Sequence, residues 1–370
     1  MKKLFGIFIF IISGYSAAYL FGFSGFHFTK EVPFDDEQTG MKEQIIIRFS
    51  HVVSENTPKG LAAGRFADLV QKKSNNRVKV VVFPNAELFS DEGELSALQS
   101  GQVQMIAPST SKLGTLSPEW LVLDLPYAFS SNEAVKEAYE GEIGKVLFAD
   151  LKKQNIEGLA FWYNGFKQMT TMKGTIIHPT DIKGQVFRIM PSKVIEKQYE
   201  VLEAAPRPIP FDQTYHNLEK GTIDGEENTI SNIYSKKYYH VQKYMTITNH
   251  AYLGYAVLMN REFWNGLPSE IQDIIREAMV EATDWNWQYS IDLNDSNLQQ
   301  LKENTSMQIY ELTPEDETEW RNKLKKVEQH FSPIIGESMM ERLQKIKNKF
   351  DRRSGSALPS DRATESICST

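Results

Sequence analysis

A single arginine interrupts an apolar segment near the middle of the chain. Arg188 lies between Val186–Phe187 and Ile189–Met190, in a segment that otherwise has the composition of a buried strand. An unpaired buried charge costs several kcal/mol, so this guanidinium needs either an internal carboxylate or an anion supplied by a ligand. The sequence therefore indicates an anion-binding role for Arg188, with an internal ion pair as the alternative.

The segments that follow Arg188 alternate between helix and strand patterns. In order, the sequence predicts a helix at 192–203, a strand over PRPIPF that ends at Phe211, a helix at 212–220 and a tight acidic turn, GTIDGEEN, at 221–228. Ligands of open α/β sheets lie outside the strand ends. We therefore expect this stretch to return repeatedly to one edge of a sheet and to build a ligand cleft there.

These residues also carry a resemblance. The order of Arg188 in RIMPS, then Phe211, then DGEEN at 224–228 resembles the extracytoplasmic solute receptors of TRAP transporters, and within them the dicarboxylate-binding branch. The likeness extends from about Ile45 to about Lys345. It implies that Arg188 forms a two-pronged salt bridge with a ligand carboxylate, that Asn228 faces the same ligand and that Phe211 lines the pocket.

One position departs from this family. In the family the NGxxQ segment carries a second arginine, whereas this chain reads NGFKQ and has Lys167 at that place. A lysine supplies a point charge without the planar fork of a guanidinium, so it neutralises a carboxylate but does not hold it bidentately. Lys167 is a candidate for a second ligand contact, with a solvated loop residue as the alternative.

Further candidates follow predicted strands in the first half of the chain. A β-α-β-α-β pattern runs from Ile45 to about residue 110 and predicts a parallel sheet with covering helices, the first of them capped by Thr57. Ser109 and Thr110 end the third strand, where contacts to a ligand are expected, although an ordinary turn explains them too. The remaining ligand candidates are His51, at the end of the first strand, and Ser192, at the end of RIMPS. His51 has a structural, hydrogen-bonded role as its alternative.

The alternation of strand and helix patterns predicts an α/β fold, and the resemblance implies the two interleaved domains of a periplasmic-binding-protein-like (venus flytrap) architecture. The segment 269–304 has no Pro or Gly and keeps apolar residues at helical spacing, so one long helix or two abutting ones are expected, and the resemblance implies a helix that spans both domains. The expected boundaries are residues 41–163 plus 250–290 for domain I, 164–249 plus 291–350 for domain II, and 351–370 for a disordered tail.

Composition and the amino-terminal segment limit the function and the compartment. The formal net charge of -7 argues against nucleic-acid binding, and the single cysteine, Cys368, excludes an internal disulfide framework. Lys2 and Lys3 precede an uncharged run at 4–29, and acidic residues follow it. Residues 1–30 are therefore predicted to be a membrane anchor that places the rest outside, or a cleaved signal peptide.

No catalytic motif accompanies these features. The cluster Asp224, Glu226 and Glu227 is expected to cap a helix, with acid and base chemistry in a secreted hydrolase as the alternative. The resemblance implies a receptor, with no cofactor or metal expected, that captures a four-carbon dicarboxylate and delivers it to TRAP membrane subunits. Two alternatives stay open: a membrane sensor kinase as the partner, and a sugar acid, keto acid or sialic acid as the ligand.

Overall fold

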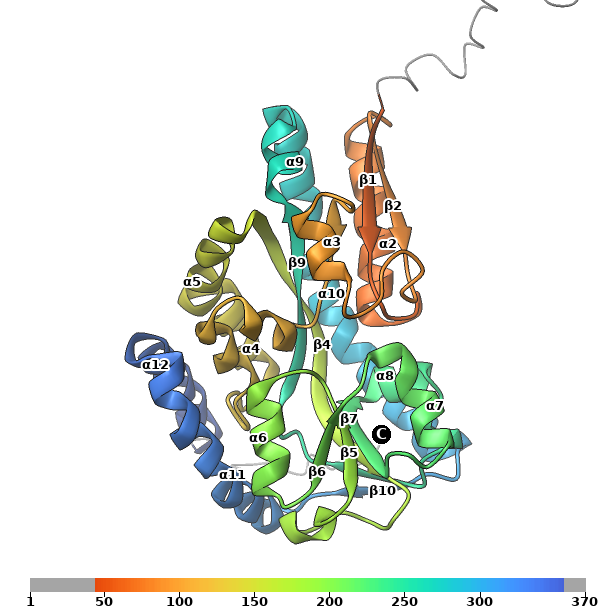
Figure 1. Cartoon of the computed structure of the whole chain (residues 1–370), viewed down its shortest axis with the longest axis vertical. Helices are drawn as coiled ribbons and strands as arrows, with labels where there is room; N and C mark the ends of the chain where they lie inside the picture. Colours follow the sequence, from red (N-terminus) through yellow and green to blue (C-terminus); the bar gives the residue numbers. More distant parts are fainter. Residues whose placement is uncertain (1–43, 356–370) are drawn as a thin grey trace, which may run out of the picture. The chain divides into compact units, whose positions relative to one another are not determined.

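The computed structural model describes residues 44–355, in which ten strands form a mixed sheet (Figure 1). The strands run in the order β2-β1-β3-β9-β4-β7-β5-β6, and β8 joins β4 and β10 at the side of this path. Their bounds are β1 (Ile45–Ser50), β2 (Val78–Phe83), β3 (Met105–Ile106), β4 (Ile156–Thr171), β5 (Val186–Ile189), β6 (Ala205–Pro208), β7 (Gly225–Thr229), β8 (Tyr244–Ile247), β9 (Tyr252–Asn260) and β10 (Gln308–Glu311).

Helices connect these strands and cover the sheet. The α-helices are α2 (Pro58–Lys73), α3 (Glu94–Gln99), α4 (Asn132–Glu140), α5 (Glu142–Leu151), α6 (Lys193–Val201), α7 (Thr214–Glu219), α8 (Ile230–Ser235), α9 (Arg261–Gly266), α10 (Ser269–Asn304), α11 (Pro314–Ile335) and α12 (Glu337–Gly355). Short 3₁₀ helices lie at η4 (Thr110–Thr115), η5 (Pro118–Asp124), η6 (Lys152–Gln154), η7 (Pro179–Ile182), η8 (Phe211–Gln213) and η9 (Tyr238–His240). The fold is the predicted α/β mixture of helices and strands, and its strands form one central sheet.

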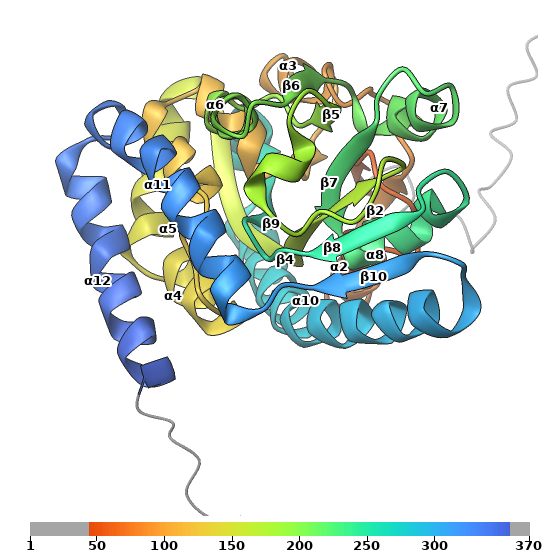
Figure 2. The ribbon, with the colours of Figure 1, turned by 90° about the horizontal axis from the view of Figure 1, so that it is seen from below.

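The sheet has two parts that share the long strand β4. We call β1, β2, β3, β9 and the first part of β4 sheet A, and the second part of β4 with β5, β6, β7, β8 and β10 sheet B. Strand β4 pairs with β9 from Ile156 to Phe166 and with β7 from Lys167 to Thr171. Figure 2 shows β8 and β10 side by side at the edge of sheet B. One continuous strand therefore carries the chain from sheet A into sheet B.

The crossover helix α2 begins where its sequence predicts. Thr57 precedes it, and the Thr57 side-chain oxygen accepts a hydrogen bond from the backbone N–H of Gly60 at 3.2 Å. Pro58 occupies the first turn, where its missing N–H costs nothing. Ala62, Phe66 and Val70 on one face of the helix are fully buried. Cap, proline and apolar face together fix both the start and the orientation of α2 against β1 and β2.

The long helix α10 matches its predicted range of 269–304. It packs against α2 and β4 and, farther along, against α8, which follows β7 of sheet B. Its buried Asn286 accepts a hydrogen bond from the Tyr163 N–H at 2.6 Å and donates to the carbonyl oxygen of Pro58 at 3.3 Å. The helix therefore ties the start of α2 to the middle of β4.

One predicted strand ends early, and the last helical stretch of the chain is divided in two. The strand expected to reach Phe211 ends at Pro208, because Pro208 and Pro210 have no N–H to extend the ladder, and Phe211 begins the short helix η8. The amphipathic stretch from Pro314 to residue 350 is divided at Gly336, which adopts a positive φ of 97° between α11 and α12. The turn lets α11 pack on α6 and α12 pack on α4 and α5.

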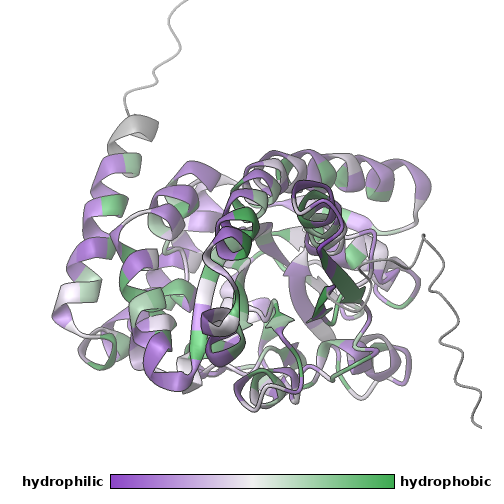
Figure 3. Ribbon diagram, turned by 90° about the horizontal axis from the view of Figure 1, so that it is seen from above, coloured by the Kyte–Doolittle hydropathy of each residue, from purple (hydrophilic) through white to green (hydrophobic). Residues whose placement is uncertain are grey.

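Apolar side chains gather on the strands and on the inward faces of the helices. Figure 3 shows hydrophilic residues alternating with hydrophobic ones along the long helices. No helix within residues 44–355 is long and apolar enough to cross a bilayer. The segment predicted to be an anchor or signal peptide lies outside the described residues, as does the predicted tail beyond Gly355.

Candidate functional site

The carboxyl ends of strands from both sheets meet in one region. Val52–Val53, which follow β1, belong to the same buried apolar cluster as Ile209 and Phe211, which follow β6. The Ser109 hydroxyl oxygen, just after β3, lies 3.5 Å from the sulfur of Met190, just after β5. Ligands of open α/β sheets bind at such strand ends, so this region is the candidate site.

A groove opens between the two sheets at this place. Its volume is about 250 Å³, and the residues that line it are neighbours of the sequence-predicted ligand residues but include none of them. The residues that line it from the side of sheet A are Asp91, Glu92, Leu95, Lys112 and Thr115, and those that line it from the side of sheet B are Pro191, Pro208, Ile209 and Pro210.

Arg188 is the centre of the site on the side of sheet B. Its side chain is buried, with 1% of its surface exposed, and its Nε donates a hydrogen bond to the Ile209 carbonyl oxygen at 2.9 Å. Its guanidinium carbon lies 5.9 Å from the centre of the Phe211 ring. Within residues 44–355 no carboxylate lies within ion-pairing distance of this guanidinium. A buried cation without a counter-ion favours an anion as the missing partner.

Glu226 lies beside Arg188 on the neighbouring strand without pairing to it. The two residues are register partners across β5 and β7. The Glu226 carboxylate instead accepts hydrogen bonds from the Thr170 hydroxyl at 2.9 Å and from the Asn228 amide at 3.2 Å. Burial raises the pKa of Glu226 to about 7, although the nearby Arg188 acts to lower it. Protonation of Glu226 would leave the Arg188 charge still less compensated.

A second buried network surrounds Glu227. Its carboxylate binds the Lys167 ammonium at 2.8 Å and the His250 Nε2 at 2.8 Å, and it accepts a hydrogen bond from the Tyr199 hydroxyl at 3.3 Å. Burial acts to raise the pKa of Glu227, but Lys167 and His250 outweigh it and hold this pKa at about 2. Lys167 is therefore already paired, and it would reach a ligand only by leaving Glu227.

The expectation that the acidic cluster caps a helix is wrong for Glu226 and Glu227. Both residues lie in strand β7 and are almost completely buried. The reason is that each carboxylate has partners on adjacent strands, which the local sequence does not reveal. Asp224 precedes the strand, and one of its oxygens accepts the Val186 N–H at 2.7 Å, so it holds the start of β5.

Asn228 and Phe211 lie on the same side of the site as Arg188. Asn228 is buried at the end of β7, and its amide oxygen accepts a hydrogen bond from the Asn232 amide at 2.8 Å. The Phe211 ring faces two cations, Arg188 and Lys236, the latter with its ammonium 5.0 Å from the ring centre. The structure brings these sequence-predicted residues together.

Four other predicted residues lie at strand or helix ends. Ser109 and Thr110 are buried at the start of η4, and the Thr110 hydroxyl donates to the Gly254 carbonyl oxygen at 3.4 Å. Ser192 is the buried residue that precedes α6. His51 is fully buried, and burial together with the Lys59 ammonium lowers its pKa to about 3. His51 is thus uncharged at neutral pH and contributes no cation to the site.

The sequence reasoning missed Lys59. This lysine lies in the first turn of α2 and is fully buried, and its ammonium donates to the Ala107 carbonyl oxygen at 2.8 Å. A signal was available, because a cation in the first turn of a helix opposes the helix dipole and is uncommon without a reason.

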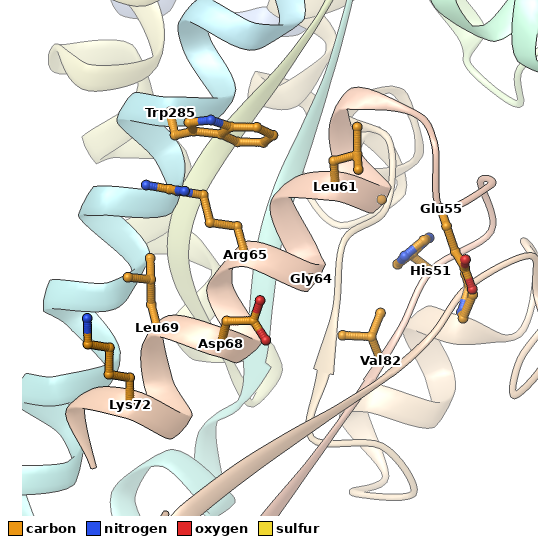
Figure 4. Close-up of a pocket in the computed structure, with 12 residues that line it drawn as sticks. His51, Glu55, Leu61, Gly64, Arg65, Asp68, Leu69, Lys72, Val82 and Trp285 are labelled. Atoms are coloured by element: carbon orange, nitrogen blue, oxygen red, sulfur yellow. The ribbon is translucent and has the colours of Figure 1, made fainter. Parts of the chain in front are cut away.

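A larger pocket of about 600 Å³ lies elsewhere, on the outer side of α2 (Figure 4). Arg65, Asp68 and Lys72 of α2 and Trp285 of α10 surround it, and among the predicted ligand residues only His51 borders it. Its charged side chains, Glu55 before α2 and Arg65, Asp68 and Lys72 on α2, are exposed and have both signs. We therefore place the candidate site at the strand ends and not in this pocket. Within the described residues, no group of three or more His, Cys, Asp or Glu side chains is placed to hold a metal ion.

Known proteins resemble this chain in sequence and in fold. The sequence profile of the bacterial extracellular solute-binding proteins, family 7, matches residues 49–333. The C4-dicarboxylate-binding protein DctB of Bacillus subtilis is 49% identical over 347 residues, which cover 94% of this chain and 99% of that relative.

Solved structures share the fold as well. A TRAP periplasmic solute binding protein from Sulfurospirillum deleyianum with bound succinate has a TM-score of 0.79 and 36% identity, and the match covers 82% of this chain and 99% of that one. A sugar acid binding protein, DctPAm from Advenella mimigardefordensis, in complex with galactonate, has a TM-score of 0.81 and 30% identity, and covers 83% of this chain and 99% of its own. Residues 49–333, which the family profile matches, include helix α10 and, apart from the first residues of β1, the strands of both sheets.

Proposed function

Because the chain belongs to family 7 of the bacterial extracellular solute-binding proteins, we propose that it captures a four-carbon dicarboxylate such as succinate, fumarate or malate. The observation that carries the proposal is Arg188, a buried guanidinium at a strand end with no carboxylate paired to it in the described part of the chain. The printed name of the Bacillus subtilis relative and the succinate in the Sulfurospirillum deleyianum structure support this class of ligand. Members of this family are solute-binding receptors and not enzymes, so the hydrolase alternative is set aside.

The proposed ligand contacts follow from the positions of the side chains. Arg188 grips one carboxylate through its fork, and charge-assisted hydrogen bonds of this kind contribute about 1.5 to 3 kcal/mol each. Asn228 offers an amide, and Phe211 shapes the wall. Ser109 and Thr110 supply hydroxyls from the side of sheet A. Ser192, His51 and Lys167 complete the predicted set, the last of them only if it exchanges Glu227 for the ligand.

A second ligand class has its own support. The structural neighbour with bound galactonate shares the fold at 30% identity, so a sugar acid is the alternative to a dicarboxylate. Calorimetric titration of the purified receptor with succinate, fumarate, malate and galactonate separates the two. Micromolar binding of at least one dicarboxylate, with no heat from galactonate, is the expected result. Preference for galactonate would overturn the dicarboxylate assignment while leaving the receptor role intact.

The partner and the compartment are proposals as well. We infer that the receptor delivers its ligand to the membrane subunits of a TRAP transporter, with a membrane sensor kinase as the alternative. The uncharged run at 4–29 is proposed to tether the chain to the outer face of the cell membrane, and cleavage as a signal peptide is the alternative. The division into domain I (41–163 plus 250–290) and domain II (164–249 plus 291–350) is proposed to let the two sheets close on the ligand.

A further inference from the structure

We propose that Lys59 binds the second carboxylate of the ligand, opposite the one that Arg188 grips. This inference rests on the proposed function, because it assigns a residue to one end of a dicarboxylate. It places one cation on each side of the site: Lys59 on α2, which follows β1 of sheet A, and Arg188 on β5 of sheet B.

The first observation is a buried ammonium with unused hydrogen-bonding capacity. Lys59 is fully buried, and its Nζ has one hydrogen bond, to the Ala107 carbonyl oxygen at 2.8 Å, and a contact with the Tyr255 ring 3.8 Å from its centre. An ammonium carries three N–H donors. Among residues 44–355 no carboxylate lies within ion-pairing distance of Lys59. Buried lysines without a counter-ion are rare, and a ligand carboxylate supplies the missing one.

The second observation is the position of Lys59 relative to the other ligand candidates. Its partner Ala107 follows β3 and lies two residues before Ser109, whose hydroxyl oxygen is 3.5 Å from the Met190 sulfur. Met190 in turn lies two residues after Arg188 in the sequence. The Lys59 ammonium is therefore anchored at the same strand ends that contact the segment of Arg188.

A hydrogen-bonded path also links Lys59 to Asn228 on sheet B. The Tyr255 ring beneath the ammonium carries a hydroxyl that accepts a hydrogen bond from the Asn164 amide at 3.0 Å. The oxygen of that amide accepts a hydrogen bond from the Ser231 hydroxyl at 3.0 Å, and Ser231 lies in α8, three residues after Asn228. A chain of contacts therefore runs from the Lys59 ammonium to the segment that follows Asn228.

The third observation separates Lys59 from its competitor. Two lysines of the described chain are completely or almost completely buried, Lys59 and Lys167. Lys167 is paired to Glu227 at 2.8 Å, whereas Glu94 and Asp91, the carboxylates that act electrostatically on Lys59, lie outside ion-pairing distance of it. Asp91 and Glu94 both lie within 4 Å of the Lys112 ammonium. Of the two buried lysines, Lys59 is therefore the one that has no ion pair and can bind a ligand carboxylate.

The ionisation of Lys59 is compatible with this role. Burial lowers the pKa of Lys59 to about 8, Glu94 and Asp91 act to raise it, and Lys112 acts to lower it. The ammonium form therefore predominates at neutral pH, and an adjacent ligand carboxylate would stabilise it further.

The test compares a dicarboxylate with a monocarboxylate of the same chain length. Wild type is expected to bind succinate at least tenfold more tightly than butyrate, because butyrate leaves Lys59 without a partner. In Lys59→Met the affinity for succinate should fall at least tenfold, while the affinity for butyrate should stay within about twofold. Lys72→Met, an exposed lysine on the same helix, is the matched control and should behave as wild type. A Lys59→Met protein that keeps the wild-type preference for succinate overturns the inference.

Two further variants separate binding from folding. Lys59→Arg keeps the charge and should retain most of the preference for succinate, whereas Lys59→Gln keeps a donor for Ala107 without the charge and should lose it. Removal of an uncompensated buried cation should not lower the Tm of the ligand-free protein. If the three variants instead lose the preference for succinate in proportion to a fall in Tm, whether or not they keep the positive charge, Lys59 has a structural role only and the inference fails.

The same titrations distinguish a failure of the proposed function from a failure of the Lys59 assignment alone. If wild type binds no dicarboxylate, the proposed function fails and the assignment of Lys59 fails with it. If wild type binds succinate and Arg188→Lys weakens this binding, but every Lys59 variant binds as wild type does, then the receptor function stands and the assignment of Lys59 alone is wrong.

Discussion

At the scale of single residues, the site depends on how buried charges are compensated. Arg188→Lys should retain the fold but weaken succinate binding by about 2 kcal/mol, roughly 30-fold in Kd, because lysine keeps the charge and loses the planar fork. Calorimetric titration measures this effect. Arg207→Lys is the matched control, since Arg207 is the exposed register partner of Arg188 on β6. Equal affinity of Arg188→Lys and wild type would make Arg188 a structural residue.

Glu226 predicts a pH dependence of stability in the ligand-free protein. Its folded-state pKa of about 7 lies above the ordinary value of 4.5, so the folded protein binds the proton more tightly than the unfolded chain does. This contribution is fully present below pH 4.5 and is lost as the pH rises to 7. The wild type should therefore lose up to about 3 kcal/mol of unfolding free energy across this window relative to Glu226→Gln, at about 1.4 kcal/mol per pKa unit.

Urea denaturation of both proteins at several pH values between 4 and 8 measures this difference. The control is Glu219→Gln, an exposed position that should follow the wild-type profile. Parallel profiles for Glu226→Gln and wild type would show that the pKa of Glu226 is the same in the folded protein and in the unfolded chain, contrary to the raised pKa.

Individual residues differ in how visible they are in the sequence. Arg188 was predictable because a cation within a buried strand pattern has few explanations. Lys59 was not found, because one lysine at the start of an amphipathic helix normally points to solvent, and its burial comes from β3 and β9, which are distant in sequence. The partners of Glu226 and Glu227 likewise lie on other strands. Tertiary pairing of charges is what local sequence cannot show.

At the scale of elements, helix α10 holds α2 and β4 together through Asn286. Its side chain bonds both backbone groups of Tyr163 and the carbonyl oxygen of Pro58. Asn286→Ala would leave these buried groups without partners, so we expect a loss of about 2 kcal/mol or more of unfolding free energy. Denaturant titration checks this value. Gln299→Ala, an exposed position of the same helix, should change stability by less than about 0.5 kcal/mol, and a similar small change for Asn286→Ala would contradict the prediction.

Elements with strong local signals were predictable from the sequence, and elements shaped by their neighbours were not. Helix α10 matched its range because 36 residues without Pro or Gly keep apolar spacing, and α2 matched because cap and proline mark its start. Strand β6 ended early at its prolines, and Gly336 divided the last helical stretch. In both cases the sequence contains the residue that ends the element. The direction that the chain takes after this residue depends on packing against sheet B and α6, which the local sequence does not determine.

At the scale of the whole molecule, function follows from the way the chain passes between the two sheets. Strand β4 belongs to both, and α10 packs against elements of each. The cations proposed as anchors therefore come from segments far apart in sequence, Lys59 and Arg188, but they are held by shared elements. A ligand that bridges them would connect sheet A and sheet B directly, which is how a bound diacid would favour a closed receptor.

The last prediction concerns how the receptor stays near its membrane partner. If the uncharged run at 4–29 is retained after export, confinement to the bilayer raises the effective concentration of the receptor at any membrane protein it contacts, so that a weak interface is sufficient. We expect the full-length protein in the membrane fraction, with a mature amino terminus upstream of residue 10, when cells are fractionated and the product is sequenced.

Replacement of residues 1–30 by a signal peptide that is known to be cleaved provides the control. This variant should be released in soluble form, should bind succinate as the full-length protein does, and should support uptake of labelled succinate less well at the same expression level. A soluble wild-type product that begins near Tyr19 would show that the segment is cleaved. Delivery would then depend on diffusion of the free receptor, and the membrane interface would need enough affinity of its own to select the ligand-bound form.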